Sequence, residues 1–414
     1  MKNKITFLTI LGLLFSSIVF ASQLENRAMK KGLRPMSMGG AFTAIADDDN
    51  AFFYNPAGIT YRNSFLIQPF SLDIAISTAI IDSYNFYTNH KSDMLHFVDK
   101  LDDEQQIKLI KKISDQVLDF YPYVFVSIPN ILFITKPIAI KKNYLNFGFG
   151  VFSYAKTNVN FNRGAPIPSV SHDSEMTVLG ILPVAFKIRS LEKIRMPGAL
   201  SLGANFKYMC RLKNVSQDKI SLRELPKYDL KEKFFHGTSF GVDFGAIYHL
   251  NSHWNFGLMI AGVYNSSVEY KNLRGNSNKM DSASGYNARI NTELNLGVAY
   301  YPEKFYYWPG KYLKTNDRLA LVFDLTDLAN SNETFIETPF KKTHIGAEYK
   351  YNSFVIRAGC NSGYPTIGGG IVTNCSTLEY AFYGEEKGLY AGQNPVWVHR
   401  ILFSVKIGHN KEKI

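Results

Sequence analysis

Residues Gly32 to Thr60 read GLRPMSMGGAFTAIADDDNAFFYNPAGIT, and this stretch decides how the rest of the chain is interpreted. A glycine pair, Gly39-Gly40, precedes a short apolar run and three aspartates, and Asn55-Pro56 lies near the end. Glycine and proline interrupt the stretch so often that neither a long helix nor a long strand fits without a kink. Asn-Pro also favours a turn. The pattern therefore predicts a folded plug or lid and not one strand of a sheet.

The N-terminus that precedes this stretch has the pattern of a secretion signal. Lys2 and Lys4 come before an apolar run at 5–20, and Val19-Phe20-Ala21 fits a cleavage site. A retained membrane anchor is the alternative, but the apolar run is short for one and a polar stretch follows it at once. We therefore expect residues 1–21 to be a cleaved signal peptide and the protein to be exported.

After residue 63 the hydrophobic period changes to two. Segments with this alternation are 200–208, 240–248, 294–300, 319–325, 345–350 and 401–407. Because side chains alternate faces along a strand, each segment offers one apolar and one polar face. Segments of about ten residues with aromatic ends suit a tilted membrane-spanning strand better than a strand of a soluble sandwich. About fourteen candidate strands predict an all-β protein, a transmembrane antiparallel β-barrel. They lie near residues 64, 122, 131, 145, 176, 199, 238, 254, 287, 318, 342, 353, 368–382 (one strand or two) and 396.

Composition supports this fold class. Aromatic residues make up 14 % of the chain, with 25 Tyr and 31 Phe, while the hydrophobic fraction is an ordinary 46 %. No segment after the signal approaches 18 consecutive apolar residues, which excludes a helical membrane protein. The formal net charge of +11 comes from scattered basic residues. Together with export, this scatter argues against a nucleic-acid partner and favours loops that meet anionic lipid headgroups.

One region breaks the strand rhythm. Between residues 84 and 118 apolar residues recur at helical spacing, with Lys and Asp between them, which predicts a short helical insertion of about two helices. Three roles remain open for it: capping the barrel mouth against the plug, binding a partner, or lying on the membrane surface.

The parts MGGAF and ADD of this N-terminal stretch, followed by NPAG, resemble the N-terminal hatch of the FadL/TodX-like (OMPP1) superfamily of outer-membrane transport barrels. A second resemblance, to the PorV-like and uncharacterised branch, rests on RAGCNSGYP at 357–365, GGG at 368–370 and EYAFY at 379–383. The resemblance implies a hatch at 22–62 that plugs a barrel at 63–414. One departure is that residues 408–414 extend past the last predicted strand, whereas such barrels usually end on an aromatic residue.

By this resemblance the protein is expected in the cell outer membrane, where it would take up hydrophobic molecules such as long-chain fatty acids passively. Its partners would be outer-membrane lipids and a fatty acid-like ligand, with no cofactor and no enzyme activity. One alternative is a PorV-like scaffold or shuttle for protein secretion, with an envelope protein as partner. Another is a lipid hydrolase on the barrel rim.

The expected site residues fall into two groups. In the hatch they are a pivot, an apolar contact, turn or cap groups and a fixing turn, in this order: Gly39 and Gly40, Phe42, Asp47 and Asp48, Asn55 and Pro56. On the polar face of the strands they are Asn205, Lys207, Asp243, Asn295, Asp324, Glu348, Arg357 and Glu379. Both charge signs are present, so this face either compensates its own charges around the plug or forms a directed substrate path. The aspartate triplet lacks the spacing of a calcium loop, and no metal site is expected.

Cysteines and a serine motif leave two smaller questions. Cys360 and Cys375 flank a predicted hairpin, so they either form a disulfide across it or remain free thiols, as Cys210 does in either case. The segment GTSFG at 237–241 matches a nucleophile elbow literally, but no helix follows it, so we interpret the match as a coincidence. Sequence alone pairs no serine with any of the histidines His236, His249, His253 and His344.

Overall fold

The computed structural model describes residues 23–25, 32–80, 85, 88, 123–162, 169–189, 191, 196–215, 220–221, 234–263, 267–272, 281–303, 306–307, 311–312, 317–330, 337–386, 390–392 and 395–408. The predicted signal peptide lies outside these residues, and so does the predicted helical insertion at 84–118, apart from residues 85 and 88. Both stay predictions. Among the described residues, no helix is both long and apolar enough to span a membrane.

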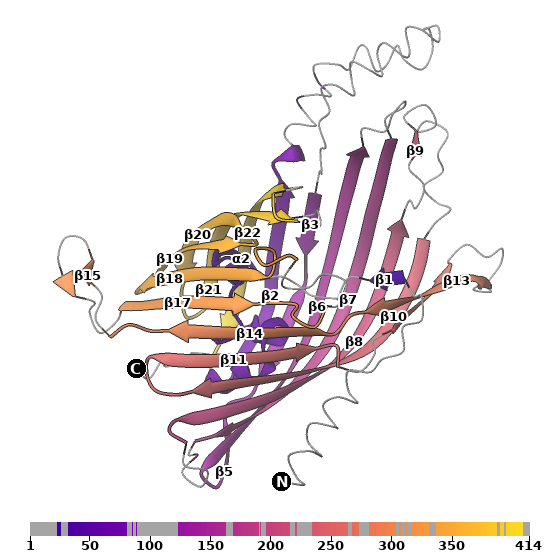
Figure 1. Ribbon diagram of the computed structural model, residues 1–414. Helices are drawn as coiled ribbons and strands as arrows, with labels where there is room; N and C mark the ends of the chain where they lie inside the picture. The colour runs from indigo at the N-terminus through magenta and orange to yellow at the C-terminus, as the bar shows by residue number, and fades with distance from the viewer. Residues whose placement is uncertain are drawn as a thin grey trace, which may run out of the picture.

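A closed antiparallel barrel forms the body of the protein, with fourteen wall strands over the described residues (Figure 1). The last wall strand pairs with the first, so closure leaves the wall without two free outer edges. The wall consists of β2 (Leu66–Ser77), β3 (Tyr123–Ser127) with β4 (Asn130–Ile134) and β5 (Ile138–Ile140), β6 (Asn143–Asn162), β7 (Ser169–Ile188), β8 (Ala199–Val215), β10 (Phe234–His249), β11 (Trp254–Ala261) with β12 (Ser267–Asn272), β13 (Asp281–Ile290) with β14 (Glu293–Tyr300), β17 (Asp317–Leu325), β18 (Thr343–Tyr351), β19 (Phe354–Asn361), β20 (Tyr364–Val372), β21 (Ser376–Glu386) and β22 (Pro395–Ile407). The predicted fold class is confirmed.

The predicted strand count is right, although two of its parts differ. The segments near 122 and 131 were expected as two strands, but β3 and β4 both pair with β2 on one side and β6 on the other, so they are one wall strand in two pieces. The segment 368–382 belongs to two strands, β20 and β21. These two differences cancel in the total.

The wall is apolar outside and polar inside. On β8, Phe206 is 43 % exposed while its neighbour Asn205 is fully buried, and on β10 the exposed Phe244 follows the buried Asp243. The same alternation of exposed apolar and buried polar side chains recurs around the wall. A water-soluble protein places apolar side chains inside, so this inverted pattern indicates a wall that faces lipid.

The wall has a long half and a short half. β6 and β7 have 20 residues each, β8 has 17 and β10 has 16, whereas β17 to β20 have 8 or 9. A tilted membrane span needs about 9–11 residues, so the long strands project beyond the short half at one end, as Figure 1 shows. Four short strands complete the list: β1 (Gln23–Glu25) beside β13, β9 (Ile220–Ser221) beside β7, and the hairpin of β15 (Tyr306–Tyr307) and β16 (Lys311–Tyr312).

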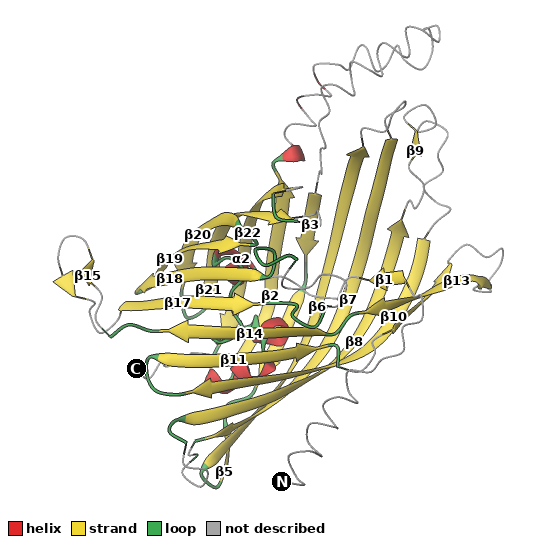
Figure 2. Cartoon of the chain, in the orientation of Figure 1, coloured by secondary structure: helices red, strands yellow, loops and turns green. Residues whose placement is uncertain are grey.

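Residues 32–62, here called the interior segment, lie inside this barrel (Figure 2). They form α2 (Leu33–Ser37), α3 (Ala51–Tyr54) and a 3-10 helix, η1 (Pro56–Tyr61). Gly39 and Gly40 follow α2 with φ of +67° and +84°, a backbone region open to glycine, so the chain turns there. α2 packs against β19, β20, β21 and β22, whereas η1 packs against β6, β7, β8 and β10 on the other half of the wall.

Candidate functional site

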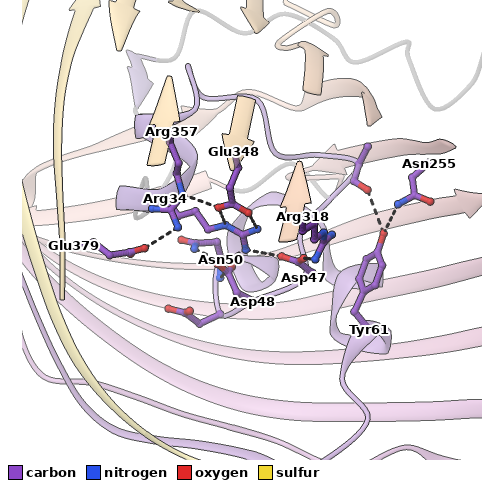
Figure 3. A network of polar contacts seen from close by, with 12 residues as sticks. Arg34, Asp47, Asp48, Asn50, Tyr61, Asn255, Arg318, Glu348, Arg357 and Glu379 are labelled. Carbon is purple, nitrogen blue, oxygen red and sulfur yellow. Dashed lines mark hydrogen bonds and ion pairs between the residues drawn. The ribbon is translucent and has the colours of Figure 1, made fainter. Parts of the chain in front are cut away.

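Arg34 of α2 is the centre of the polar contacts inside the barrel (Figure 3). Its Nε and Nη2 donate to the two carboxylate oxygens of Glu348 on β18, each at 2.7 Å. Its Nη1 donates to Asp47 at 2.5 Å and to Asp48 at 2.9 Å. The planar guanidinium suits this arrangement because it presents several N–H groups in fixed directions. One side chain therefore ties α2 both to the aspartate triplet and to the wall.

The surroundings set the charge states of this centre. Burial by itself would lower the pKa of Arg34, but Asp47, Glu348 and Asp48 outweigh it and raise that pKa well above its usual value. Burial would raise the pKa of Asp47, but Arg34 and then Arg318 outweigh burial and hold that pKa below its usual value. At Asp48 burial dominates over the attraction of Arg34, and the pKa is raised. The pKa values of two adjacent aspartates are therefore shifted in opposite directions, downward at Asp47 and upward at Asp48.

Further ion pairs extend the centre into the short half of the wall. Arg357 donates from Nε to Glu348 at 2.6 Å, and its Nη2 forms an ion pair with Glu379 at 2.7 Å. Arg318 contacts Asp47 at 3.2 Å, as Figure 3 shows, and Lys406 contacts Asp49 at 3.2 Å. The interior side of this half thus carries charged groups that pair with each other and with the interior segment. Unpaired buried charges are costly, so loss of one partner would destabilise this half of the interior.

The backbone around Gly39 and Phe42 is held by two more wall residues. Asp324 of β17 accepts hydrogen bonds from the backbone N–H groups of Phe42 and Thr43, both at 2.7 Å. His344 of β18 donates from Nδ1 to the carbonyl of Gly39 at 2.7 Å, which leaves Nε2 to accept from a threonine hydroxyl. The Phe42 ring is fully buried, with its centroid 5.0 Å from the Arg34 guanidinium carbon.

Asn55 and Pro56 start η1 on the long half of the wall. The Asn55 side chain accepts from the N–H of Ala57 and donates to the carbonyls of Thr43, Ala246 and Leu258 at 2.9–3.3 Å. Proline suits the first position of a helix because its missing N–H is not needed there. The predicted turn therefore also bonds to β10 and β11.

Wall glycines let the interior segment approach closely. Nine of them, on eight wall strands, have an atom of residues 37–57 in contact with the position of an added Cβ: Gly148, Gly150, Gly203, Gly245, Gly257, Gly297, Gly346, Gly359 and Gly368. A Cβ on Gly245 would lie 2.1 Å from the Asn55 side-chain oxygen, and one on Gly203 would lie 2.3 Å from the Ala57 nitrogen. Glycine in a strand interior often marks such a close approach. Interior segment and wall are therefore matched in shape.

Two apolar clusters flank the interior segment. The larger joins its middle to the long half of the wall, with Phe52 and Phe53 packed edge-on against Phe152 of β6. The smaller joins Leu33 and Met36 of α2 to interior side chains of the wall, among them Phe125, Tyr154 and Tyr383. The second cluster is thus the smaller of two apolar areas inside the barrel, and the guanidinium carbon of Arg400 lies 5.0 Å from the centroid of its Phe125 ring.

The predicted polar-face residues lie on the inner side of the wall. Asp324, Glu348, Arg357 and Glu379 join the contacts described above, and Asn205 donates to the backbone carbonyl of Phe52 at 3.0 Å. Lys207 pairs with Asp243 at 2.6 Å on β8 and β10. Asn295, which is only half-buried, accepts from the N–H of Asp327 at the end of β17. Seven of the eight predicted residues are thus buried, five of them against the interior segment or its ion pairs.

Of the two alternatives left open for Cys360 and Cys375, the structure shows free thiols, and Cys210 is free as well. Cys360 opposes Pro365 next to the β19–β20 turn, whereas Cys375 follows the far end of β20. Nine extended residues separate the two ends by about 30 Å, while a disulfide joins Cα atoms about 4.4–6.8 Å apart. In the described part of the chain, no three His, Cys, Asp or Glu side chains gather as metal ligands would.

A serine and a histidine do come within hydrogen-bond reach. Ser201 Oγ lies 3.3 Å from His249 Nε2, and His249 Nδ1 lies 3.1 Å from Asn255 Oδ1. Ser201 is fully buried, and Thr60 of η1 donates to it at 2.8 Å, so the interior segment occupies the place of a substrate. Asn255 also donates to the Tyr61 hydroxyl, as Figure 3 shows. This chain of contacts anchors η1 to the wall. Ser239 of the GTSFG match lies within β10, where no helix follows.

Arg34 and the wall glycines were missed in the sequence. Arg34 is the one basic residue in 32–60, which also contains three aspartates, so the sequence held a signal for an internal ion pair. Its wall partner, Glu348, is 314 positions away, and no local pattern connects them. The glycines look like ordinary small residues of alternating strands. Only the docked interior segment gives them a role.

Comparisons with known proteins give one family and several solved structures. The model of the family described as "F plasmid transfer operon, TraF, protein" matches residues 52–309. Similar solved structures include the toluene transporter TodX of Pseudomonas putida, with 12 % identity, a TM-score of 0.46, and 94 % of this chain and 100 % of that chain covered. The toluene transporter TbuX of Ralstonia pickettii has 11 % identity, a TM-score of 0.45, and coverages of 95 % and 100 %. A Pseudomonas aeruginosa FadL homologue has 11 % identity, a TM-score of 0.46, and coverages of 94 % and 100 %. No curated protein sequence matches the chain. The PorV-like branch stays a prediction.

Proposed function

We propose that this chain, which belongs to the family described as "F plasmid transfer operon, TraF, protein", is an outer-membrane channel for the passive uptake of hydrophobic molecules such as long-chain fatty acids. Outer-membrane location is supported by the wall itself, because exposed apolar and buried polar side chains alternate along its strands. A hydrophobic molecule crosses the hydrated outer surface of such a membrane poorly by itself, so a barrel with an apolar binding site inside would speed its entry.

The observation that carries this proposal is the apolar patch on the inner wall. Phe125, Tyr154 and Tyr383 are nearly fully buried there, against Leu33 and Met36 of α2. The inner side of the short half carries ion pairs, which offer an apolar molecule nothing in exchange for lost water contacts. An apolar ligand that took the place of Leu33 or Met36 would keep water away from the patch, so its binding would expose no apolar surface there. The patch is therefore the place where a hydrophobic ligand would bind.

In this proposal the interior segment acts as the hatch of the barrel. Gly39 and Gly40 are its expected pivot, because a glycine at positive φ changes conformation without a Cβ clash. Phe42, Asp47, Asp48 and the Asn55-Pro56 turn keep it in place through the contacts described above. Transport of this kind needs no chemical step, so we infer that the protein is not an enzyme.

Replacing Phe125 by alanine tests the proposal against a matched control. Phe125 faces the interior patch, while Phe133, on the second piece of the same wall strand, is 38 % exposed on the outer face. We expect Phe125→Ala to lower ligand affinity by about tenfold or more, because burying such a side chain is worth about 1.5–3 kcal/mol. Phe133→Ala should leave uptake unchanged.

The measurement is uptake of radiolabelled oleate and toluene by cells in which this protein is the main entry route, together with mass spectrometry of apolar molecules that co-purify with it. Equal loss in both variants would point to a general defect of the barrel and not to the patch. Uptake by the unaltered protein no greater than that of cells lacking it would contradict the proposed function.

A scaffold or shuttle for exported proteins is the second candidate, and one observation favours it. The family description names a plasmid transfer operon and not the uptake of a small molecule, so a protein of this family would act beside a transfer apparatus. Cross-linking of the intact protein in cells with and without such an apparatus separates the two candidates. A stoichiometric envelope partner, together with normal uptake in the Phe125→Ala variant, would favour the scaffold.

A further inference from the structure

Strand pairing changes at the boundary between the long and short halves of the wall, where β13 and β14 face β17. β14 pairs with β17 from Tyr300 up to Leu296, where β17 ends at Leu325. The following turn stays beside β14 only a little further, since the N–H of Leu328 donates to the carbonyl of Leu294 at 2.9 Å. β13 continues beyond this point, paired with β12 on its other edge. The edge of β13 that points toward the short half is thus beyond the reach of β17.

The N-terminal strand of the chain lies on this edge. β1 (Gln23–Glu25) pairs with β13 through Gln23 opposite Ala288, Leu24 opposite Arg289 and Glu25 opposite Ile290. The pairing is parallel, whereas the other described strand pairs are antiparallel. The pairing of β1 with β13 begins at Ile290, about four residues from Leu294, which makes the last hydrogen bond with the turn after β17. In Figure 1, β1 lies close to β13 at this side of the barrel.

Two properties distinguish β1 from the rest of the wall. Its ladder has three register pairs, and parallel pairing is slightly less stable per residue than antiparallel pairing. It also lies shortly before the interior segment in the chain. The bidentate contact of Arg34 with Glu348 anchors the start of that segment. β1 can therefore leave β13 while the interior segment stays docked against the wall glycines. Removing the interior segment would instead break its ion pairs and its close backbone contacts together.

We propose that Gln23–Glu25 is a removable strap, which closes a side opening of the wall between β13 and β17. An unpaired strand edge is open to pairing with other chains, so it has to be covered. Release of the strap opens a route between the barrel interior and its surroundings without movement of the interior segment. The identity of what passes, a small apolar molecule, rests on the proposed function. The presence of the strap does not.

Proline substitutions test the strap. Successive residues of a strand point their N–H groups to opposite sides, so Leu24→Pro combined with Glu25→Pro removes at least one N–H that faces β13. The control combines Leu24→Ala with Glu25→Ala, which changes the same side chains and keeps both N–H groups. Both variants should keep the heat-modifiable migration of a folded barrel, because neither residue belongs to a wall strand or to the interior segment.

Two readouts separate the strap from the function. We expect amide hydrogen exchange at residues 288–290 to rise by about tenfold or more in the proline variant and to stay unchanged in the alanine variant, as local opening predicts. Entry of the apolar dye N-phenyl-1-naphthylamine into intact cells should rise in the proline variant alone.

Unchanged exchange in the proline variant would overturn the strap. Faster exchange without faster dye entry would overturn its role in closing a route. If the unaltered protein admits no more dye than cells lacking it, the proposed function fails, while faster exchange in the proline variant would still support the strap.

Discussion

The two ends of the interior segment are held in the same barrel by different physics. At the α2 end, charged groups meet the short half of the wall, with Arg34 bound to Asp47, Asp48 and Glu348. At the η1 end, neutral groups meet the long half, where Asn55 bonds to backbone carbonyls and Thr60 bonds to Ser201. Close backbone contacts at Gly203 and Gly245 add shape complementarity to these hydrogen bonds.

This difference separates two ways to hold a segment in a barrel. A buried ion pair requires both of its charged partners, so removal of one partner leaves the other buried and unpaired at a high cost in free energy. Neutral contacts depend on shape, so they tolerate loss of a hydrogen bond better than insertion of an atom. The α2 end should therefore respond to charge and pH, and the η1 end to added volume.

The largest effect is expected from Arg34→Ala. The substitution leaves Asp47, Asp48 and Glu348 without their shared cation, and breaking a buried pair in this way costs about 3–5 kcal/mol. Hydrogen exchange should rise in 33–48 and much less in 55–61. Arg34→Lys serves as the control, because it keeps the charge but loses the fork, and its effect should be intermediate. Equal exchange at both ends in the alanine variant would contradict the separation.

A smaller effect is expected at the η1 end from Gly245→Ala. The new Cβ would lie 2.1 Å from the Asn55 oxygen and 2.8 Å from Pro56, and overpacking of this kind costs about 1–3 kcal/mol. Gly180→Ala on β7 is the control, since the nearest atom to its Cβ is 3.9 Å away. Thermal unfolding of the purified barrel, with exchange at 55–61, measures both variants. A matching loss of stability in the control would show that contact with the interior segment is not the cause.

The smallest effect is the pH dependence of the α2 end. The raised pKa of Asp48 means that its folded form binds a proton more readily than its unfolded form, so stability rises as pH falls from 7 through that pKa. The lowered pKa of Asp47 means that its contribution is present at neutral pH and is lost only as pH falls below the usual range of aspartate. We expect changes of the order of 1 kcal/mol.

Unfolding profiles between pH 3 and pH 8 check this order. Asp48→Asn should remove the rise on mild acidification, and Asp47→Asn should remove the loss in strong acid. A profile in which Asp47→Asn abolishes the rise instead would show that the two aspartates have exchanged roles.

The barrel was largely predictable from the sequence, because the alternation that places Phe206 outside and Asn205 inside is local. Each strand carries its own two faces in neighbouring residues, and a wall facing lipid needs little more. The broken wall strand of β3 and β4 was harder, since only pairing with β2 and β6 shows that two short runs occupy one position. The choice between a disulfide and free thiols at Cys360 and Cys375 stayed open for the same reason: spacing along the chain did not reveal that β20 separates the two thiols.

What the sequence by itself determined is the alternation of the wall and the turn-rich character of residues 32–60. Both follow from the conformational preferences of single residues and their neighbours. Only the tertiary structure decided that Arg34 meets Glu348, that nine wall glycines receive the interior segment, and that β1 lies on β13. These contacts join residues hundreds of positions apart, and their energies exist only after closure of the barrel has brought the partners together and excluded water from between them.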